Sequence, residues 1–380
     1  MTELDPERQH KAREYARISR GLWLIGVLLS GGYALAWLAF GWGTALRGWL
    51  VSASPAMGNP WLQVPAFLLV FAGIFMALTF PLSYHAGYVL PHRFGQSTQT
   101  LKSWIVDQIK NLLIGAALGL PMLELLYLAL RAAGDAWWLW ATAGMLIVNV
   151  LLTNLAPVIL MPLFNKYEPL GQEHDDLAKR LRRLAEHAHT QVRGVYKFDM
   201  SRRTVAANAA LTGIGNTRRI ILADTLINEF TPDEIEAVLA HELGHHVHRD
   251  ILLYIGAGSV VTAIGLFAAG QAMNWAVANF GFAGVSDPAA FPALALILGA
   301  YGLVTMPIEN AVSRWREGLA DRYALEATGK SEAFASAFVR LANQNLSEVD
   351  PQRWVVWMFY SHPPLVERIA SARRWKPAAA

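Results

Sequence analysis

Long apolar stretches without charged residues recur along the chain. The stretches that lack Asp, Glu, Lys and Arg are 21–46, 48–92, 136–165, 251–286 and 288–308. Each is long enough to hold the roughly 20 apolar residues that cross a bilayer as a helix. A further apolar segment contains Asp107, Lys110 and Glu124, with the first two near its polar end. We predict six membrane helices near 21–43, 64–89, 104–131, 136–162, 251–279 and 289–311.

Composition supports a membrane protein. The chain has 380 residues, of which 54% are hydrophobic and 16% charged. Soluble domains carry about 25% charged residues, so buried helices of a soluble protein are a weak explanation for these runs. The first twenty residues mix acids and bases, and no small-residue cleavage site follows a short apolar core. We therefore expect a retained first helix and not a cleavable signal peptide.

Basic residues predict the orientation. The segment before the first span carries five of them, the segment after span four is also basic, and the loop between spans five and six has none. Because cytoplasmic loops are enriched in Lys and Arg, we expect both termini and the segment 166–250 in the cytoplasm. Arg outnumbers Lys and Ala is abundant, which favours a bacterial source and hence the inner membrane. The net charge of +3 gives no nucleic-acid signal.

The segment 241–245 reads His-Glu-Leu-Gly-His, an H-E-x-x-H motif. Residues four apart share one face of a helix, so His241 and His245 can bind one metal ion. Glu242 can then act as general base toward a metal-bound water. Thr231, Pro232 and Glu234 form a helix start with a capping box. This pattern predicts zinc-assisted hydrolysis of a peptide bond, with an accidental motif on an amphipathic helix as the alternative.

A catalytic zinc site needs a third protein ligand and an open position. The chain has no cysteine, so the ligands must be His or carboxylate. Glu317 and Asp321 lie four residues apart, just beyond the last predicted span. We assign Glu317 as the third ligand of one Zn²⁺ per chain, and Asp321 as an acceptor for a ligand imidazole. Alone, such a pair usually lies on a solvated helix face.

At this point the sequence resembles the CAAX prenyl protease 1 family of integral-membrane zinc metallopeptidases. The matching segments, in order, are YVLPHRFGQSTQTLKSWIVDQIK at 88–110, LMPLFNKYEPL at 160–170, NAALTGIGNTRRIILADTLI at 208–227, HELGHH at 241–246, SRWREGLAD at 313–321 and SHPPLVERI at 361–369. The resemblance implies zinc on His241, His245 and Glu317, with Glu242 as catalytic base and Asp321 beside a ligand. It covers most of the chain.

The resemblance also implies roles for weaker signals. Residues 204–213 look like the edge strand of a zincin, which pairs with an extended substrate. Asn208 and Ala209 match substrate-facing positions, although Asn208 is equally typical of an ordinary turn. His362 matches a histidine that stabilises the oxyanion. Arg368 either binds a carboxylate or is a surface charge, and we favour the surface charge.

The predicted fold is mainly α, a polytopic helical membrane protein with a cytoplasmic zincin-like catalytic region that contains a small β-sheet near 193–227. We divide the chain into 1–165 with spans one to four, 166–250 with the sheet and the H-E-x-x-H helix, 251–311 with spans five and six, and 312–380 with the third ligand. No Gly or Pro interrupts 247–255. We therefore expect the H-E-x-x-H helix to continue into span five, and span six to continue into the helix of Glu317.

Three classes of function stay open. The first is a membrane metalloendopeptidase whose peptide or protein substrate is prenylated, or a stress-type quality-control protease of the same clan that does not depend on prenylation. The second is a transporter or channel, although no internal repeat or broken-helix pair supports it. The third is a non-catalytic scaffold, which the complete set of motif residues disfavours. The sequence does not give the oligomeric state.

Overall fold

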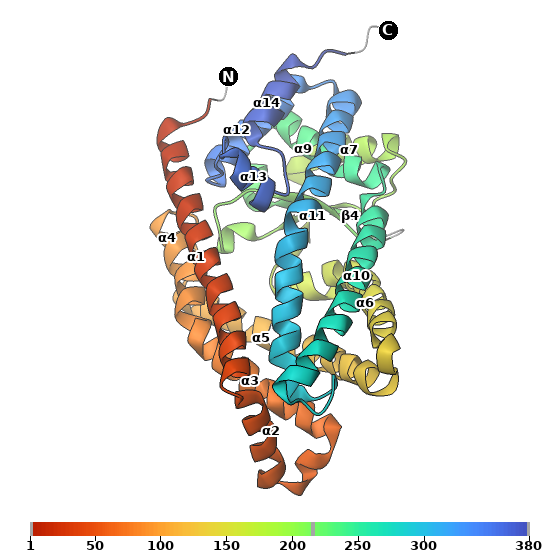
Figure 1. Cartoon of the computed structure of the whole chain (residues 1–380). Helices are drawn as coiled ribbons and strands as arrows, with labels where there is room; N and C mark the ends of the chain where they lie inside the picture. Colours follow the sequence, from red (N-terminus) through yellow and green to blue (C-terminus); the bar gives the residue numbers. More distant parts are fainter. Residues whose placement is uncertain (1–2, 214–216, 378–380) are drawn as a thin grey trace.

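Long helices dominate the computed structural model, which describes residues 3–213 and 217–377 (Figure 1). Six helices in this part of the chain are long and apolar enough to cross a membrane, as predicted: Pro6–Ala39, Pro60–Arg93, Leu101–Ala132, Gly134–Leu155, Asp250–Phe280 and Pro288–Thr328. The last continues past the apolar segment into the stretch that carries Glu317, which confirms the expected continuity. Residues 214–216 of the family-like segment 208–227 lie outside the described residues.

The membrane part is built from α1 (Pro6–Ala39), α2 (Trp42–Ala53), α3 (Pro60–Tyr84), α4 (Leu90–Arg93), α5 (Leu101–Ala132), α6 (Trp137–Leu155), α10 (Asp250–Phe280) and α11 (Phe291–Thr328). Helix α1 begins fifteen residues before the predicted span because its polar first turns have partners. Asp5 caps it by accepting from two backbone N–H groups. The Arg8 Nε atom donates to the carbonyl oxygen of Asn343 at 2.6 Å, which fastens α1 to the C-terminal region.

A four-stranded mixed sheet lies beside the helices. Its strands are β1 (Tyr167–Pro169), β2 (Val195–Phe198), β3 (Ala209–Thr212) and β4 (Arg219–Ala223), in the spatial order β1-β2-β4-β3. Strands β2 and β4 are parallel, and the other two pairs are antiparallel. Strand β3 is therefore an edge, as the sequence predicts, but it is shorter than 204–213. Strand β1 lies outside the predicted range of the sheet.

The remaining helices belong, with the sheet, to the region that carries the H-E-x-x-H motif. They are α7 (Asp175–His187), α8 (Asp224–Glu229), α9 (Pro232–Val247), α12 (Ser331–Gln344), α13 (Arg353–Phe359) and α14 (Leu365–Arg374). Buried apolar residues of β4, α7, α9, α12 and α14 form its core, which includes Leu222, Leu239 and Phe334. A second core joins the membrane helices around Phe67, Tyr127 and Met273. The start of α1 and helix α14 lie at the same end of the molecule, beside α9 and α12 (Figure 1).

The expected continuity of the H-E-x-x-H helix with span five is wrong. Helix α9 ends at Val247, and α10 begins at Asp250. Between them Arg249 adopts a left-handed conformation with φ of 56°. A residue with a Cβ pays a steric cost there, so sequence rules that look for Gly or Pro miss this break. Tertiary contacts of the neighbouring residues hold the turn, and they belong to the site described next.

Candidate metal centre

The local sequence of α9 presents two imidazoles to α11. The Thr231 side chain accepts from the Glu234 N–H while Glu234 accepts from the Thr231 N–H, which completes the predicted capping box. Gly244 lets α11 approach, because a Cβ at that position would lie 2.8 Å from the Cα atom of Ala320. Ala320 lies one turn after Glu317. The helix start and this close contact therefore place Glu317 opposite both histidines.

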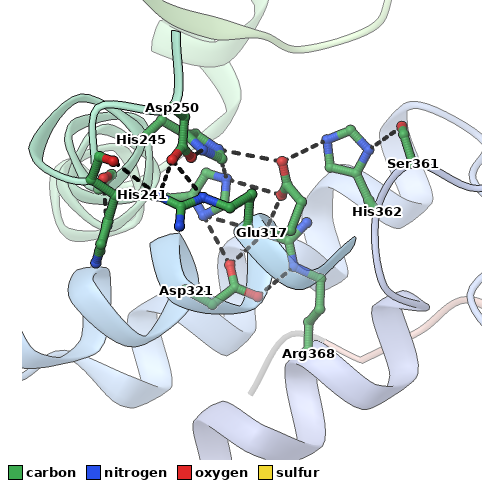
Figure 2. Close-up of polar contacts among 11 residues, drawn as sticks. His241, His245, Asp250, Glu317, Asp321, Ser361, His362 and Arg368 are labelled. Atoms are coloured by element: carbon green, nitrogen blue, oxygen red, sulfur yellow. Dashed lines mark hydrogen bonds and ion pairs between the residues drawn. The ribbon is translucent and has the colours of Figure 1, made fainter. Parts of the chain in front are cut away.

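The three predicted ligands converge on one point (Figure 2). The Nε2 atoms of His241 and His245 lie 3.2 Å apart. Glu317 Oε2 lies 3.3 Å from His241 Nε2, and Glu317 Oε1 lies 3.3 Å from His245 Nε2. The donor atoms of all three side chains lie within 4.8 Å of one another. Two imidazoles and a carboxylate in this arrangement match the donor set of a catalytic zinc site.

Hydrogen bonds on the far side of each ring assign the tautomers. His241 Nδ1 lies 2.8 Å from Asp321 Oδ1, and His245 Nδ1 lies 2.7 Å from Asp250 Oδ2. A carboxylate only accepts, so both Nδ1 atoms carry a proton, and Nε2 is the nitrogen of each ring that remains to bind a metal ion. Glu317 Oε2 is buried without a hydrogen-bond donor. Two ring nitrogens and a buried carboxylate this close together favour a cation between them, a proton or a metal ion, so these residues fit a metal ion.

The pKa shifts of the site residues also favour a cation at this point. Burial by itself lowers the pKa of His241, but the facing carboxylates of Asp321 and Glu317 outweigh burial and raise that pKa to about 9. The pKa of His245 is also raised against burial, through Glu317 and Asp250. The site therefore favours a positive charge at the imidazoles. Burial raises the pKa of Glu242, which makes this carboxylate a better proton acceptor.

His362 reaches the same point from the segment before α14. Its Nε2 atom lies 3.3 Å from Glu317 Oε1, while its side chain remains 57% exposed. The Ser361 hydroxyl lies 2.9 Å from its Nδ1 atom. Because the Glu317 carboxylate only accepts, Nε2 carries the proton and Ser361 donates to Nδ1. Partial desolvation lowers the pKa of His362, so at neutral pH it is a neutral donor aimed into the site.

The two predicted substrate positions lie at the start of the edge strand. Asn208 is exposed and directly precedes β3, and its carbonyl oxygen accepts from the Ala223 N–H at 2.9 Å. Ala209 is buried and pairs with Leu222. Strand β3 therefore keeps one side unpaired within the sheet. Substrate contact at Asn208 and Ala209 stays a prediction.

The interpretation of Arg368 as a surface charge is wrong. Its side chain is buried, and its Nε atom donates to Asp321 Oδ2 at 2.8 Å. Its guanidinium lies 4.0 Å from the centre of the Phe338 ring. It reaches the site because α14 packs against α12, which a single sequence does not reveal. Arg368 thus holds the carboxylate that holds His241.

Sequence reasoning missed Asp250 and Arg316. Asp250 accepts from His245 (Figure 2). It also accepts from Arg316 Nε at 2.6 Å. Both side chains are buried. One signal was available, because an aspartate directly before a long apolar helix is a typical helix start. The prediction of one continuous helix through residue 250 was incompatible with a helix start there.

A polytopic helical fold with an H-E-x-x-H helix and a His-His-Glu cluster defines a membrane metallopeptidase. Residues 171–376 match the family described as "Peptidase family M48". Residues 1–166 match "CAAX prenyl protease N-terminal, five membrane helices", whereas four helices of this part of the described chain qualify as spans. The chain belongs to peptidase family M48, which confirms the family resemblance.

Relatives and solved structures agree with this assignment. The chain is 31% identical to "Uncharacterized metalloprotease YhfN" of Bacillus subtilis, over 98% of this chain and 87% of that protein. It is 30% identical to "CAAX prenyl protease 1" of Saccharomyces cerevisiae, over 97% and 86%. The structure titled "Crystal Structure of S. mikatae Ste24p" matches with a TM-score of 0.86 and 27% identity, over 98% and 90%.

Proposed function

We propose that this membrane metallopeptidase is a zinc endopeptidase that cuts peptide bonds near the C-terminus of prenylated proteins. The convergence of donor atoms of His241, His245 and Glu317 within 4.8 Å of one another is the observation that carries the metal site. The two-histidine, one-carboxylate donor set favours zinc. The prenylated substrate is supported by the Saccharomyces cerevisiae relative named "CAAX prenyl protease 1", which aligns with 97% of this chain.

The mechanism assigns one task to each side chain. His241, His245 and Glu317 would hold the zinc ion, which would supply Lewis acidity toward water and the scissile carbonyl. Glu242 accepts the proton of the attacking water and passes it to the leaving amine. The Nε2–H group of His362 donates to the carbonyl oxygen as negative charge develops on it. Asp321 holds the tautomer of His241 through its 2.8 Å hydrogen bond.

The unpaired edge of β3 supplies the substrate track. An extended peptide adds to such an edge through backbone hydrogen bonds. These bonds position the scissile peptide bond and do not depend on the side chains of the substrate. Asn208, exposed at the start of the edge, adds a side-chain hydrogen bond to the peptide. Ala209 contributes its backbone, because its side chain is buried.

We further propose a bacterial inner membrane with the catalytic region and both termini in the cytoplasm. The basic residues of α1 support this orientation, because its first turns bind the catalytic region. The chain has no cysteine, so single cysteines can report topology. In intact bacterial cells, an impermeant maleimide should label Ala283→Cys, between α10 and α11, and spare Lys376→Cys until the membrane is permeabilised. The opposite pattern would reverse the orientation.

Cleavage of matched peptides tests the substrate. The detergent-purified protein is given a farnesylated CAAX peptide or its unprenylated twin, with Glu242→Gln as the inactive control. We expect prenyl-dependent cleavage by the parent and none by the variant. Equal cleavage of both peptides by the parent would refute prenyl recognition and favour general membrane-protein quality control. Cleavage that survives in Glu242→Gln would refute the assignment of the base.

A further inference from the structure

The break between α9 and α10 is positioned at the metal centre. Only two residues, His248 and Arg249, separate the helix of the two histidines from a membrane helix. Arg249 turns the chain with φ of 56°, a conformation that side chains with a Cβ rarely adopt. Backbone in a disfavoured conformation persists only where surrounding contacts over-determine it, and it gathers at functional sites.

The contacts that hold the break converge on Asp250. This first residue of α10 is 2% exposed. Its Oδ2 atom accepts from His245 Nδ1 at 2.7 Å, and its Oδ1 atom accepts from Arg316 Nε at 2.6 Å. Arg316 also donates to the carbonyl oxygen of His248 at 3.0 Å. One arginine of α11 therefore binds both sides of the turn.

The turn is what brings Asp250 to His245. In a continuous helix, residues five apart point about 140° away from each other, so Asp250 could not contact the ring of His245. The left-handed residue redirects the chain and places the carboxylate behind the second imidazole. A straight helix would leave His245 Nδ1 without this acceptor.

Behind each imidazole lies a carboxylate that is itself bound by an arginine. His241 donates to Asp321, which binds Arg368, and His245 donates to Asp250, which binds Arg316. Carboxylates placed in this way fix the tautomer and raise the basicity of a ligand nitrogen. Arg316 directly precedes the third ligand, Glu317. Helix α11 thus provides a ligand and also part of the support of each histidine.

We propose that Asp250 is a positioning residue for His245, and that the Arg316-bound break between α9 and α10 exists to place it. This inference rests on the proposed metal site. It makes the start of a membrane helix a part of the metal centre. If the turn only connected the two helices, zinc affinity would not depend on which residue stands at position 250. If Asp250 positions His245, zinc affinity depends on the Asp250 carboxylate and on the conformation of residue 249.

Two pairs of variants separate these roles. Asp250→Asn removes the charge at nearly constant shape, and Asp175→Asn is its control at the exposed start of α7. Arg249→Gly and Arg249→Val both remove the exposed arginine, but only glycine tolerates a positive φ. The measurements on the purified full-length protein are zinc affinity by chelator competition, the absorption spectrum of the Co²⁺ form, and the melting temperature.

We expect Asp250→Asn to lose about 10- to 100-fold in zinc affinity, the usual effect of removing such a support. Arg249→Val should lose affinity in the same direction and alter the Co²⁺ spectrum, whereas Arg249→Gly and Asp175→Asn should match the parent. Zinc affinity within two-fold of the parent in Asp250→Asn, or equal affinity in the two Arg249 variants, would overturn the inference.

The outcomes distinguish this inference from the proposed function. A parent protein that binds no zinc would refute the metal site itself. A parent that binds one zinc, with unchanged affinity in Asp250→Asn, would refute only the role of Asp250. If Asp250→Asn does not fold, the decision falls to the Arg249 pair, because the side chain of residue 249 is exposed and contacts no proposed ligand.

Discussion

The contact between Gly244 and Ala320 makes a quantitative prediction for Gly244→Ala. A Cβ at residue 244 would lie 2.8 Å from Ala320 Cα, whereas ordinary contacts begin at 3.4 Å, so α9 and α11 must separate by about 0.6 Å. Overpacking of this kind costs about 1–3 kcal/mol, and the better helix propensity of alanine returns about 1 kcal/mol. The stability loss should therefore be small, at most about 2 kcal/mol.

The effect on metal binding should be larger than the effect on stability. Metal–ligand distances tolerate about 0.2 Å, so a shift of Glu317 by several tenths of an ångström should weaken zinc binding by at least about tenfold. Chelator competition measures this loss. Gly318→Ala is the matched control, because its Cβ would meet nothing within 4 Å although it adjoins Glu317. Zinc affinity within two-fold of the parent in Gly244→Ala would refute the close-contact argument.

Three further predictions concern Glu242 as the catalytic base, the buried side chain of Arg368 and the pH dependence of zinc affinity. Glu242→Gln should abolish turnover, a loss of at least about 100-fold, and still bind one zinc; activity that persists would remove Glu242 as the base. Arg368→Met should lower the free energy of unfolding by about 3–5 kcal/mol, because it removes the arginine charge that is paired with the buried Asp321 carboxylate. Unchanged denaturant unfolding would return Arg368 to the surface-charge interpretation. Because the pKa of His241 is raised to about 9, protons compete with zinc below that pH, and affinity should weaken by about tenfold per unit as the pH falls from 8 to 6. A flat profile measured by chelator competition would contradict the proton competition.

Local signals predicted the parts of the site that lie within single helices. The capping box at Thr231 and the four-residue spacings of His241 with His245 and of Glu317 with Asp321 are read directly from the chain. Hydropathy likewise predicted the six candidate spans, because five are continuous apolar runs and the third is apolar apart from a few charged residues. These features depend on neighbours within one or two turns, so a single sequence contains them.

The remaining features depend on contacts between distant segments. Asp250 and Arg316 are 66 residues apart, and their side chains meet beside the left-handed turn at Arg249. Arg368 looks like an ordinary helix charge until α14 packs beside α12 and directs it toward Asp321. Strand β1 has only three residues, which are too few to show a strand pattern. It pairs with β2, and α7 separates the two strands in the sequence.

Anomalous diffraction at the zinc absorption edge tests the central claim most directly. Crystals of the zinc-loaded parent should show one strong peak per chain, in contact with His241 Nε2, His245 Nε2 and the Glu317 carboxylate, and absent from a Glu317→Ala crystal. A peak bound by other residues, or no peak in protein that retains peptidase activity, would contradict the proposed metal centre.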